Sequence, residues 1–281
     1  MQRPPQIPGY ELFQRLGDGA TSHVYAGRDA QTDEDVAVKI LREDWYDDET
    51  AIQLLRREAR TGMAVEHRHL VRVLEARVSS PPYFLVMNLI SGEAVRHRMW
   101  REYCLDHPSA IWIARQTAEA LGAMHKAGYI HGDVKPDNIR LVDTGTAVLI
   151  DLGFSHKPGE NQAVLEQGFV LGTPNYLPPE MCDRAAVDDF AGDIYALGIS
   201  LFEMLTGELP YPTGNVKDVM RRHRLDPAAS LYDYPGPWPT ALIKLVDAMC
   251  ERTWQHRPTA NQVVQSLIGC EIHTMSRRRA A

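Results

Sequence analysis

Two carboxylates, a lysine and an amide side chain lie in two short segments near the middle of the chain. Residues 131–138 read His-Gly-Asp-Val-Lys-Pro-Asp-Asn and follow a segment with helical periodicity. The next apolar run, residues 147–150, ends in Asp151-Leu152-Gly153. A carboxylate can orient a hydroxyl group and accept its proton, an ammonium can neutralise a phosphate, and Asn with a second Asp can hold Mg²⁺. The two segments therefore indicate phosphoryl transfer.

A glycine-containing turn near the N-terminus could contact the phosphates. Gly17 and Gly19, followed by Ser22 and Val24, lie between two segments that read as strands. Glycine lets backbone N–H groups approach a phosphate closely, where a Cβ would obstruct them. Taken alone, these glycines fit an ordinary hairpin equally well. The Val-Ala-Val-Lys run at residues 36–39 favours a phosphate-binding loop.

Lys39 and Glu58 form a candidate pair. A lysine on an isolated strand usually points to solvent, and a glutamate on a helix is usually solvated. Acidic residues 47–49 predict the start of a helix, and Glu58 lies near its apolar face. The residues expected to be buried on that face are Ile52, Leu55, Ala59 and Met63. We expect Glu58 to hold Lys39 against the α- and β-phosphates.

The elements divide the chain into two parts at Ser91-Gly92. Residues 10–90 read as about five strands with one helix, and residues 91–272 as mostly helical, with helices expected at 109–127, 193–205, 240–250 and 260–268. The Pro-rich residues 1–9 read as an extension without a core of its own. Residues 273–281 read as a short, disordered basic tail.

Composition narrows the class of protein. The 281 residues are 44% hydrophobic and 24% charged, with a net charge of −7, which argues against general nucleic-acid binding. No apolar run is long enough to span a bilayer, and the N-terminus shows no signal peptide. The four cysteines lack metal-ligand spacing, so we expect reduced thiols in a cytoplasmic protein.

Five motifs occur in a fixed order, and together they resemble the eukaryotic-like (Hanks-type) Ser/Thr protein kinase family, most closely its bacterial members. The resemblance covers residues from about 10 to 272. The motifs are His131-x-Asp133-x-Lys135-x-x-Asn138, Asp151-Leu152-Gly153, the segment 172–180 from Gly172 to Glu180, Asp193-Ile194-Tyr195-Ala196-Leu197-Gly198, and Arg257-Pro258-Thr259. The resemblance implies an α+β, bilobal protein-kinase-like fold with a small β-rich N-lobe and a larger, mainly helical C-lobe.

The resemblance also implies residue roles. Asp133 would orient the hydroxyl of a protein Ser or Thr and act as base, and Lys135 would contact the γ-phosphate of ATP. Asn138 and Asp151 would hold Mg²⁺, or Mn²⁺ in its place. Lys135 with Thr173 is the Ser/Thr-specific form of this site. The residues expected to bind ATP are Gly17, Gly19, Ser22, Val24, Ala37, Lys39, Met87 as gatekeeper, Asn88, Leu89 and Ile90 as hinge, and Arg140.

Three further residues would support the site without performing chemistry. The resemblance implies that Glu180 and Arg257 form a buried ion pair beneath the activation segment. It also implies that Asp193 braces the backbone of the catalytic loop.

Gly132 departs from the family pattern, because many kinases carry there an arginine that receives an activation-loop phosphate. Between Phe154 and Leu171 the only hydroxyl residue is Ser155. The charge receptor and the modifiable residue are therefore missing together. We hypothesise that activity does not require activation-loop phosphorylation.

Arg140 is a second departure, since the family normally has an apolar residue beneath the adenine ring at this position. A guanidinium can stack on an aromatic face, or fold aside with its stem as the floor. In the alternative register, Ile139 or Leu141 would form the floor.

Two other functions remain open. His-Gly-Asp is also the form of the catalytic triplet in aminoglycoside and choline kinase relatives, so a small-molecule kinase is one alternative. A pseudokinase that acts as a binding module is the other, prompted mainly by Arg140.

Overall fold

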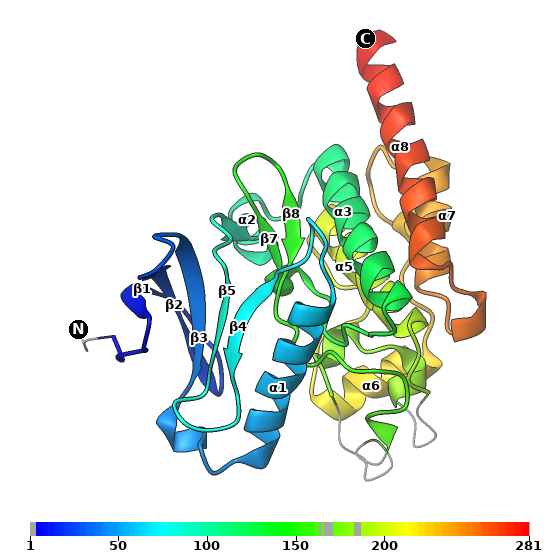
Figure 1. Ribbon diagram of the computed structural model, residues 1–281. Coiled ribbons are helices and arrows are strands. Elements are labelled where there is room, and N and C mark those ends of the chain that lie inside the picture. The colour runs from blue at the N-terminus through cyan, green and yellow to red at the C-terminus, as the bar shows by residue number, and fades with distance from the viewer. Residues whose placement is uncertain (1–3, 163–164, 166–170, 183–186, 281) are drawn as a thin grey trace.

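The computed structural model has two lobes joined through the segment after β5 (Figure 1). It describes residues 4–162, 165, 171–182 and 187–280. The N-lobe is a five-stranded antiparallel sheet in the order β1-β2-β3-β5-β4. Its strands are β1 (Tyr10–Asp18), β2 (Ser22–Asp29), β3 (Asp35–Leu41), β4 (Val73–Arg77) and β5 (Phe84–Asn88).

Alternation along β3 decides which residues face the other lobe. Val36, Val38 and Ile40 pack with Phe84 and Val86 on one face of the sheet. Ala37 and Leu41 join the main core on the opposite face, and Lys39 shares that orientation because strand side chains alternate. Within the N-terminal extension, Ile7 is 4% exposed and belongs to the first of these clusters, so this part of the extension packs on the N-lobe sheet.

Helix α1 (Glu49–Ala64) packs on the N-lobe sheet and is capped by Asp48, whose side chain accepts a hydrogen bond from the Ala51 N–H. Ile52, Leu55 and Ala59 are buried as expected. Met63 is 60% exposed, so the prediction that it belongs to the buried face was wrong. Gly62 takes its place, since a Cβ there would lie 2.4 Å from the Val73 side chain. Close approach of β4 therefore selects glycine and turns Met63 to solvent.

The C-lobe is mainly helical. Its helices are α2 (Val95–Glu102), α3 (His107–Lys126), α5 (Ala191–Thr206), α6 (Val216–Leu225), α7 (Thr240–Met249) and α8 (Ala260–Ala280). Helix α5 is buried on almost all sides and ends at Gly207, which has the left-handed φ of 79°. Helix α8 continues to Ala280, well beyond the expected helix end at residue 268.

Short elements hold the segments that face the N-lobe. A three-stranded sheet in the order β6-β7-β8 contains β6 (Glu93–Ala94), β7 (Ile139–Leu141) and β8 (Ala147–Leu149). It places residues 131–138 and 151–153 side by side, because one precedes β7 and the other follows β8. The 3₁₀ turns are η1 (Glu43–Trp45), η2 (Pro136–Asn138), η3 (Pro174–Tyr176), η4 (Pro179–Cys182), η5 (Leu231–Asp233) and η6 (Trp254–His256).

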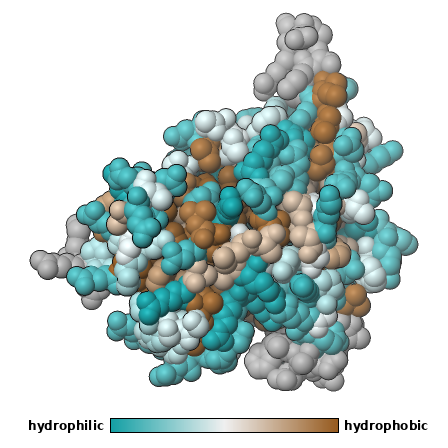
Figure 2. Space-filling model, in the orientation of Figure 1, coloured by the Kyte–Doolittle hydropathy of each residue, from teal (hydrophilic) through white to brown (hydrophobic). Residues whose placement is uncertain are grey.

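Figure 2 shows a mostly hydrophilic face with hydrophobic residues gathered in a band across the middle of the molecule. Within the described part of the chain, no helix combines the length and hydropathy needed to cross a bilayer. The four cysteines are free thiols, and three of them are buried.

Candidate active site

A cavity of about 630 Å³ separates the two lobes. Strands β1 to β3 and α1 line one side, and residues 133–140 and 150–154 line the other. Except for Thr173, every residue that the sequence predicted for catalysis, ATP binding or metal binding lines this cavity. Thr173 lies directly beyond it and contacts Asp133. The volume and the mixed polar and apolar lining suit a ligand of nucleotide size.

Lys39 bridges two carboxylates at the inner end of the cavity. Its Nζ donates to Glu58 Oε2 at 2.6 Å and to Asp151 Oδ1 at 3.0 Å. Burial favours the neutral amine, but the charges of Asp151 and Glu58 outweigh it and raise the pKa of Lys39. The Lys39 ammonium in turn lowers the pKa of Asp151. Lys39 is therefore held as a cation and oriented by Glu58 on α1 and by Asp151.

Asp133 accepts bonds from three side chains. Lys135 Nζ donates to Asp133 Oδ2 at 2.6 Å and to Thr173 Oγ1 at 2.6 Å. Thr173 Oγ1 donates to Asp133 Oδ1 at 2.7 Å. Asn138 Nδ2 donates to the backbone oxygen and to Oδ2 of Asp133, at 2.9 and 3.0 Å. The carboxylate of Asp133 is thereby fixed in orientation and remains a potential proton acceptor.

Asn138 and Asp151 suit a hard cation. Because the amide nitrogen of Asn138 makes the bonds to Asp133, its amide oxygen is left for a metal ion. Asp151 has φ of 62°, a conformation that costs energy for a residue with a Cβ and is typical of functional positions. Among the described residues, no group of three or more His, Cys, Asp and Glu gathers as a metal site. Mg²⁺ fits such a pair, because it is usually bound through one or two protein oxygens together with phosphates.

Asp193 holds the backbone of the catalytic loop from helix α5, as expected. Its Oδ2 accepts from the His131 N–H at 2.8 Å and its Oδ1 from the Gly132 N–H at 2.9 Å. His125 Nε2 lies 2.9 Å from Oδ2. Burial opposes ionisation of Asp193, but the bonds from His125 and the loop outweigh it and lower its pKa. The buried carboxylate of Asp193 thus helps to fix Gly132, the residue before Asp133.

Glu180 and Arg257 form the expected buried pair. The two guanidinium nitrogens donate to the two carboxylate oxygens at 2.6 and 2.7 Å. The Arg257 side chain has no exposed area and lies over the Tyr195 ring. This bidentate pair ties η4 to the segment before α8.

The glycine turn joins β1 to β2 above the cavity. Gly19 N–H donates to the Ser22 oxygen at 2.8 Å, and Ser22 is 4% exposed. A Cβ on Gly19 would lie 3.3 Å from that same oxygen, so the turn is tight at this residue. Ala37 and Met87 are cross-strand partners, and the hinge residues 88–90 follow.

Arg140 faces the cavity, whereas its neighbours do not. Ile139 and Leu141 are buried in the main core, and strand alternation leaves Arg140 on the cavity side. The guanidinium donates to the Gly92 oxygen beside the hinge, and burial lowers the pKa of Arg140. The alternative register, with Ile139 or Leu141 as the floor, is wrong for this structure.

Ser155 is inaccessible. It is 0% exposed, and its hydroxyl contacts Thr61 Oγ1 at 2.7 Å and the Leu152 oxygen at 2.6 Å. The rest of the predicted activation loop is described only in part, because residues 163–164 and 166–170 lie outside the described residues. No residue in that part of the sequence carries a hydroxyl group.

Sequence reasoning missed a charged network at the mouth of the cavity. Arg96 Nη1 donates to Glu203 Oε1 at 2.6 Å, and Arg96 Nε donates to Asp137 Oδ2 at 3.2 Å. The Tyr176 hydroxyl donates to Glu203 Oε2 at 2.6 Å. Asp137 lies within the catalytic-loop motif at residues 131–138. No local sequence pattern links Arg96 to Glu203, which lies 107 residues further along the chain.

The sequence of this chain was compared with protein families and with curated proteins, and both comparisons found protein kinases. A family model described as the protein kinase domain matches residues 10–267. The chain is 35% identical over 233 residues to the serine/threonine-protein kinase PknB of Mycobacterium leprae, covering 81% of this chain and 37% of that protein. It is 30% identical over 214 residues to the serine/threonine-protein kinase PrkC of Bacillus subtilis, covering 76% and 33% respectively. A probable serine/threonine-protein kinase of Clostridium perfringens is 29% identical over 92% of this chain and 38% of its own length.

The chain therefore spans little more than a third of the length of these curated relatives. The matched range nevertheless includes both lobes and every motif around the cavity. The chain belongs to the protein kinase family.

Proposed function

We propose that this chain is a Ser/Thr protein kinase that transfers the γ-phosphoryl group of Mg-ATP to Ser or Thr hydroxyls of proteins. The observation that carries the proposal is the Asp133–Lys135–Thr173 cluster, placed at one end of a nucleotide-sized cavity whose other end holds Lys39 between two carboxylates. Protein kinases use ATP and a divalent metal, and the pair Asn138 and Asp151 favours Mg²⁺.

In this mechanism Asp133 accepts the proton of the attacking hydroxyl as its oxygen bonds to the γ-phosphorus. The bond between that phosphorus and the oxygen of the leaving ADP breaks. Lys135 lies 2.6 Å from Asp133 and can neutralise charge on the transferred group. Lys39 binds the other phosphates, and Glu58 keeps its ammonium in place. A metal ion held by Asn138 and Asp151 would supply further positive charge to the phosphates.

We also propose that the activity does not depend on phosphorylation of the activation loop. Ser155, the one hydroxyl residue of that loop, is fully buried and hydrogen-bonded to α1. The catalytic loop carries Gly132 instead of a cationic receptor. A cytoplasmic location remains part of the proposal and is supported by the free thiols.

One assay tests the activity against its alternatives. The protein is incubated with Mg-ATP and either a generic basic protein or an aminoglycoside, and Asp133→Ala serves as control. Phosphate transfer to the protein that is lost in Asp133→Ala supports the proposal. Transfer only to the aminoglycoside identifies a small-molecule kinase. No transfer by the wild-type chain to either acceptor identifies a pseudokinase.

A further inference from the structure

Gly132 leaves space on the catalytic loop, and the start of the activation segment fills it. Gly132 has φ of 81°, and a Cβ there would lie 2.9 Å from the Phe154 oxygen and 3.4 Å from Cε1 of His156. His156 also exchanges both backbone hydrogen bonds with Ile130, at 2.8 and 3.1 Å. The His156 ring thus lies against the residue that replaces the usual arginine, one position before Asp133.

The hydrogen bonds of His156 define its charge. Nδ1 lies 2.7 Å from the Phe154 backbone oxygen, which can only accept. Nε2 lies 2.7 Å from Asp188 Oδ1, in the segment that leads into α5. When both ring nitrogens face acceptors, both must carry a proton, so the arrangement fits an imidazolium opposite a carboxylate. His156 and Asp188 have side chains that are each 4% exposed.

The surroundings of the ring are acidic. The small cavity beside it is lined by Asp188, Asp189 and Asp193 on the α5 side and by Asp133 on the catalytic loop. Asp188 Oδ2 and Asn161 Oδ1 are further buried oxygens that have no hydrogen-bond partner among the described residues. No Lys or Arg occurs among the described residues lining this cavity. Burial disfavours the charged ring, but Asp188 outweighs it and raises the pKa of His156.

We propose that the buried His156–Asp188 pair positions the activation segment against the catalytic loop, in the role that a phosphorylated residue and an arginine would otherwise share. The proposal rests on the protein kinase function proposed above. It concerns what holds the activation segment against the catalytic loop of that active site. His156 and Asp188 are positioning residues, since neither lines the nucleotide cavity.

The pair can affect catalysis because His156 contacts the catalytic loop directly, and the far end of the activation segment contacts the same loop. Its backbone bridge at Ile130 fixes the entry to residues 131–133. At the other end of the segment, a Cβ on Gly172 would lie 2.8 Å from the Gly132 oxygen, and the next residue, Thr173, donates to Asp133. Asp193 still holds the Gly132 N–H when His156 is loosened, but Gly132 loses the packing of the activation segment against it, and the position of the Asp133 carboxylate becomes less well defined.

The test measures kcat and the KM for ATP of His156→Gln, Asp188→Asn and the double variant, with the basic protein as acceptor. Both single variants should lose about 10- to 100-fold in kcat, which is typical of a misplaced catalytic group, while KM for ATP stays within about twofold. The double variant should be no worse than the more impaired single variant, because both changes remove one interaction.

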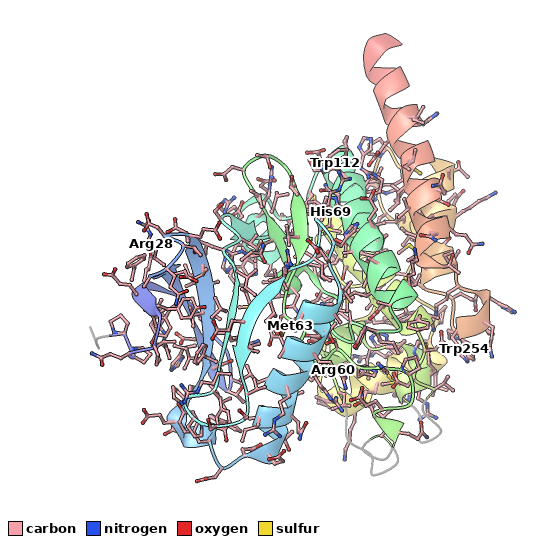
Figure 3. All side chains as sticks on the ribbon, viewed as in Figure 1. Arg28, Arg60, Met63, His69, Trp112 and Trp254 are labelled. Carbon is pink, nitrogen blue, oxygen red and sulfur yellow. The ribbon has the colours of Figure 1, made fainter. Side chains whose placement is uncertain are left out.

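His69→Gln is the matched control. His69 (Figure 3) is similarly buried, with Nδ1 2.8 Å from the Ala147 oxygen and Nε2 3.3 Å from Glu119 Oε2. It lies outside the nucleotide cavity and the activation segment. We expect its kcat to stay within about twofold of wild type. An equal loss in His69→Gln, an additive double variant, or an unchanged kcat in the single variants would each overturn the proposal.

A titration of the histidine ring nitrogens by NMR tests the charge without requiring activity. A raised pKa means that the charged pair is complete below the ordinary histidine pKa of 6.5 and is lost as pH rises through the folded value. We expect the His156 midpoint in wild type to lie above the ordinary histidine pKa of 6.5, and to move to lower pH in Asp188→Asn. A wild-type midpoint at or below 6.5 contradicts the proposal even in an active kinase. Failure of the proposed function appears separately, as absent phosphotransfer.

Discussion

Replacing Glu180 by Gln should strip the buried Arg257 of its counter-ion while keeping the shape of the partner. Arg257 has no exposed side-chain area, and Glu180 has 7%. The guanidinium keeps contacts with the Glu251 oxygen at 2.7 Å, the Ala191 oxygen at 3.0 Å and the Tyr195 ring. These contacts cannot replace the carboxylate charge, so a buried cation is left without full compensation.

The expected loss can be estimated from the burial. Removing one partner of a buried ion pair costs about 3–5 kcal/mol, and the remaining carbonyl contacts place this case near about 3 kcal/mol. For 281 residues unfolding together, an entropy of about 2 cal/mol/K per residue converts that loss into a fall in Tm of about 5 °C. ATP affinity should not change, because neither residue lines the nucleotide cavity.

The assay is urea denaturation followed by tryptophan fluorescence, with ATP affinity measured on the same samples. Glu93→Gln is the control, because Glu93 also forms a bidentate pair, with Arg101, but that arginine is 59% exposed. We expect no measurable change in that variant.

A loss below about 1 kcal/mol in Glu180→Gln would refute the argument that burial makes this pair indispensable. The double variant Glu180→Gln/Arg257→Met provides a second check. It should be more stable than Glu180→Gln alone, since it removes the uncompensated charge. If it is less stable, the cost arises from packing around Arg257 and the electrostatic explanation is wrong.

Three further predictions concern the nucleotide site and the activation segment. Arg140→Leu should weaken ATP binding by about 0.5–2 kcal/mol if the guanidinium stacks on adenine, and an unchanged Kd in calorimetry would exclude stacking. Phosphatase treatment should leave kcat unchanged, because Ser155 is fully buried; a large loss linked by mass spectrometry to a site within residues 155–173 would contradict this. Arg60 (Figure 3) pairs with Glu160 at 2.7 and 2.9 Å. Burial of Glu160 opposes its ionisation, but the bond from Arg60 outweighs it and lowers the Glu160 pKa to about 2. The pair should therefore stabilise the fold above pH 4.5 and be lost as pH falls toward 2, and Arg60→Ala should remove this part of the pH dependence of unfolding.

The sequence by itself determined the features that depend on local pattern. The apolar run from Val36 to Leu41 after the turn at residues 32–35 predicted the strand that carries Lys39, and acidic residues 47–49 predicted the start of α1. The order of the motifs carried the resemblance to the protein kinase family, and that resemblance implied the residues around the cavity. For Arg140 the sequence left two registers open, and only the structure shows that Arg140 lines the cavity while Ile139 and Leu141 are buried in the core.

Only the tertiary structure decided the features that depend on partners distant in sequence. Helical periodicity put Met63 on the buried face of α1, but close approach of β4 buries Gly62 instead. Composition indicated that residues 1–9 form an extension without a core of its own, and only the structure shows that Ile7 packs in the cluster of Val36, Val38 and Phe84.

The pairing of His156 with Asp188 is of the same kind. The sequence marked Gly132 as the place where a charge receptor was missing, and showed that Ser155 is the only hydroxyl residue between Phe154 and Leu171. It could not show that a histidine lies against that glycine and bonds to a carboxylate 32 residues away. Such contacts depend on how the activation segment folds over the catalytic loop, and long-range packing of that kind leaves no periodic signal in the sequence.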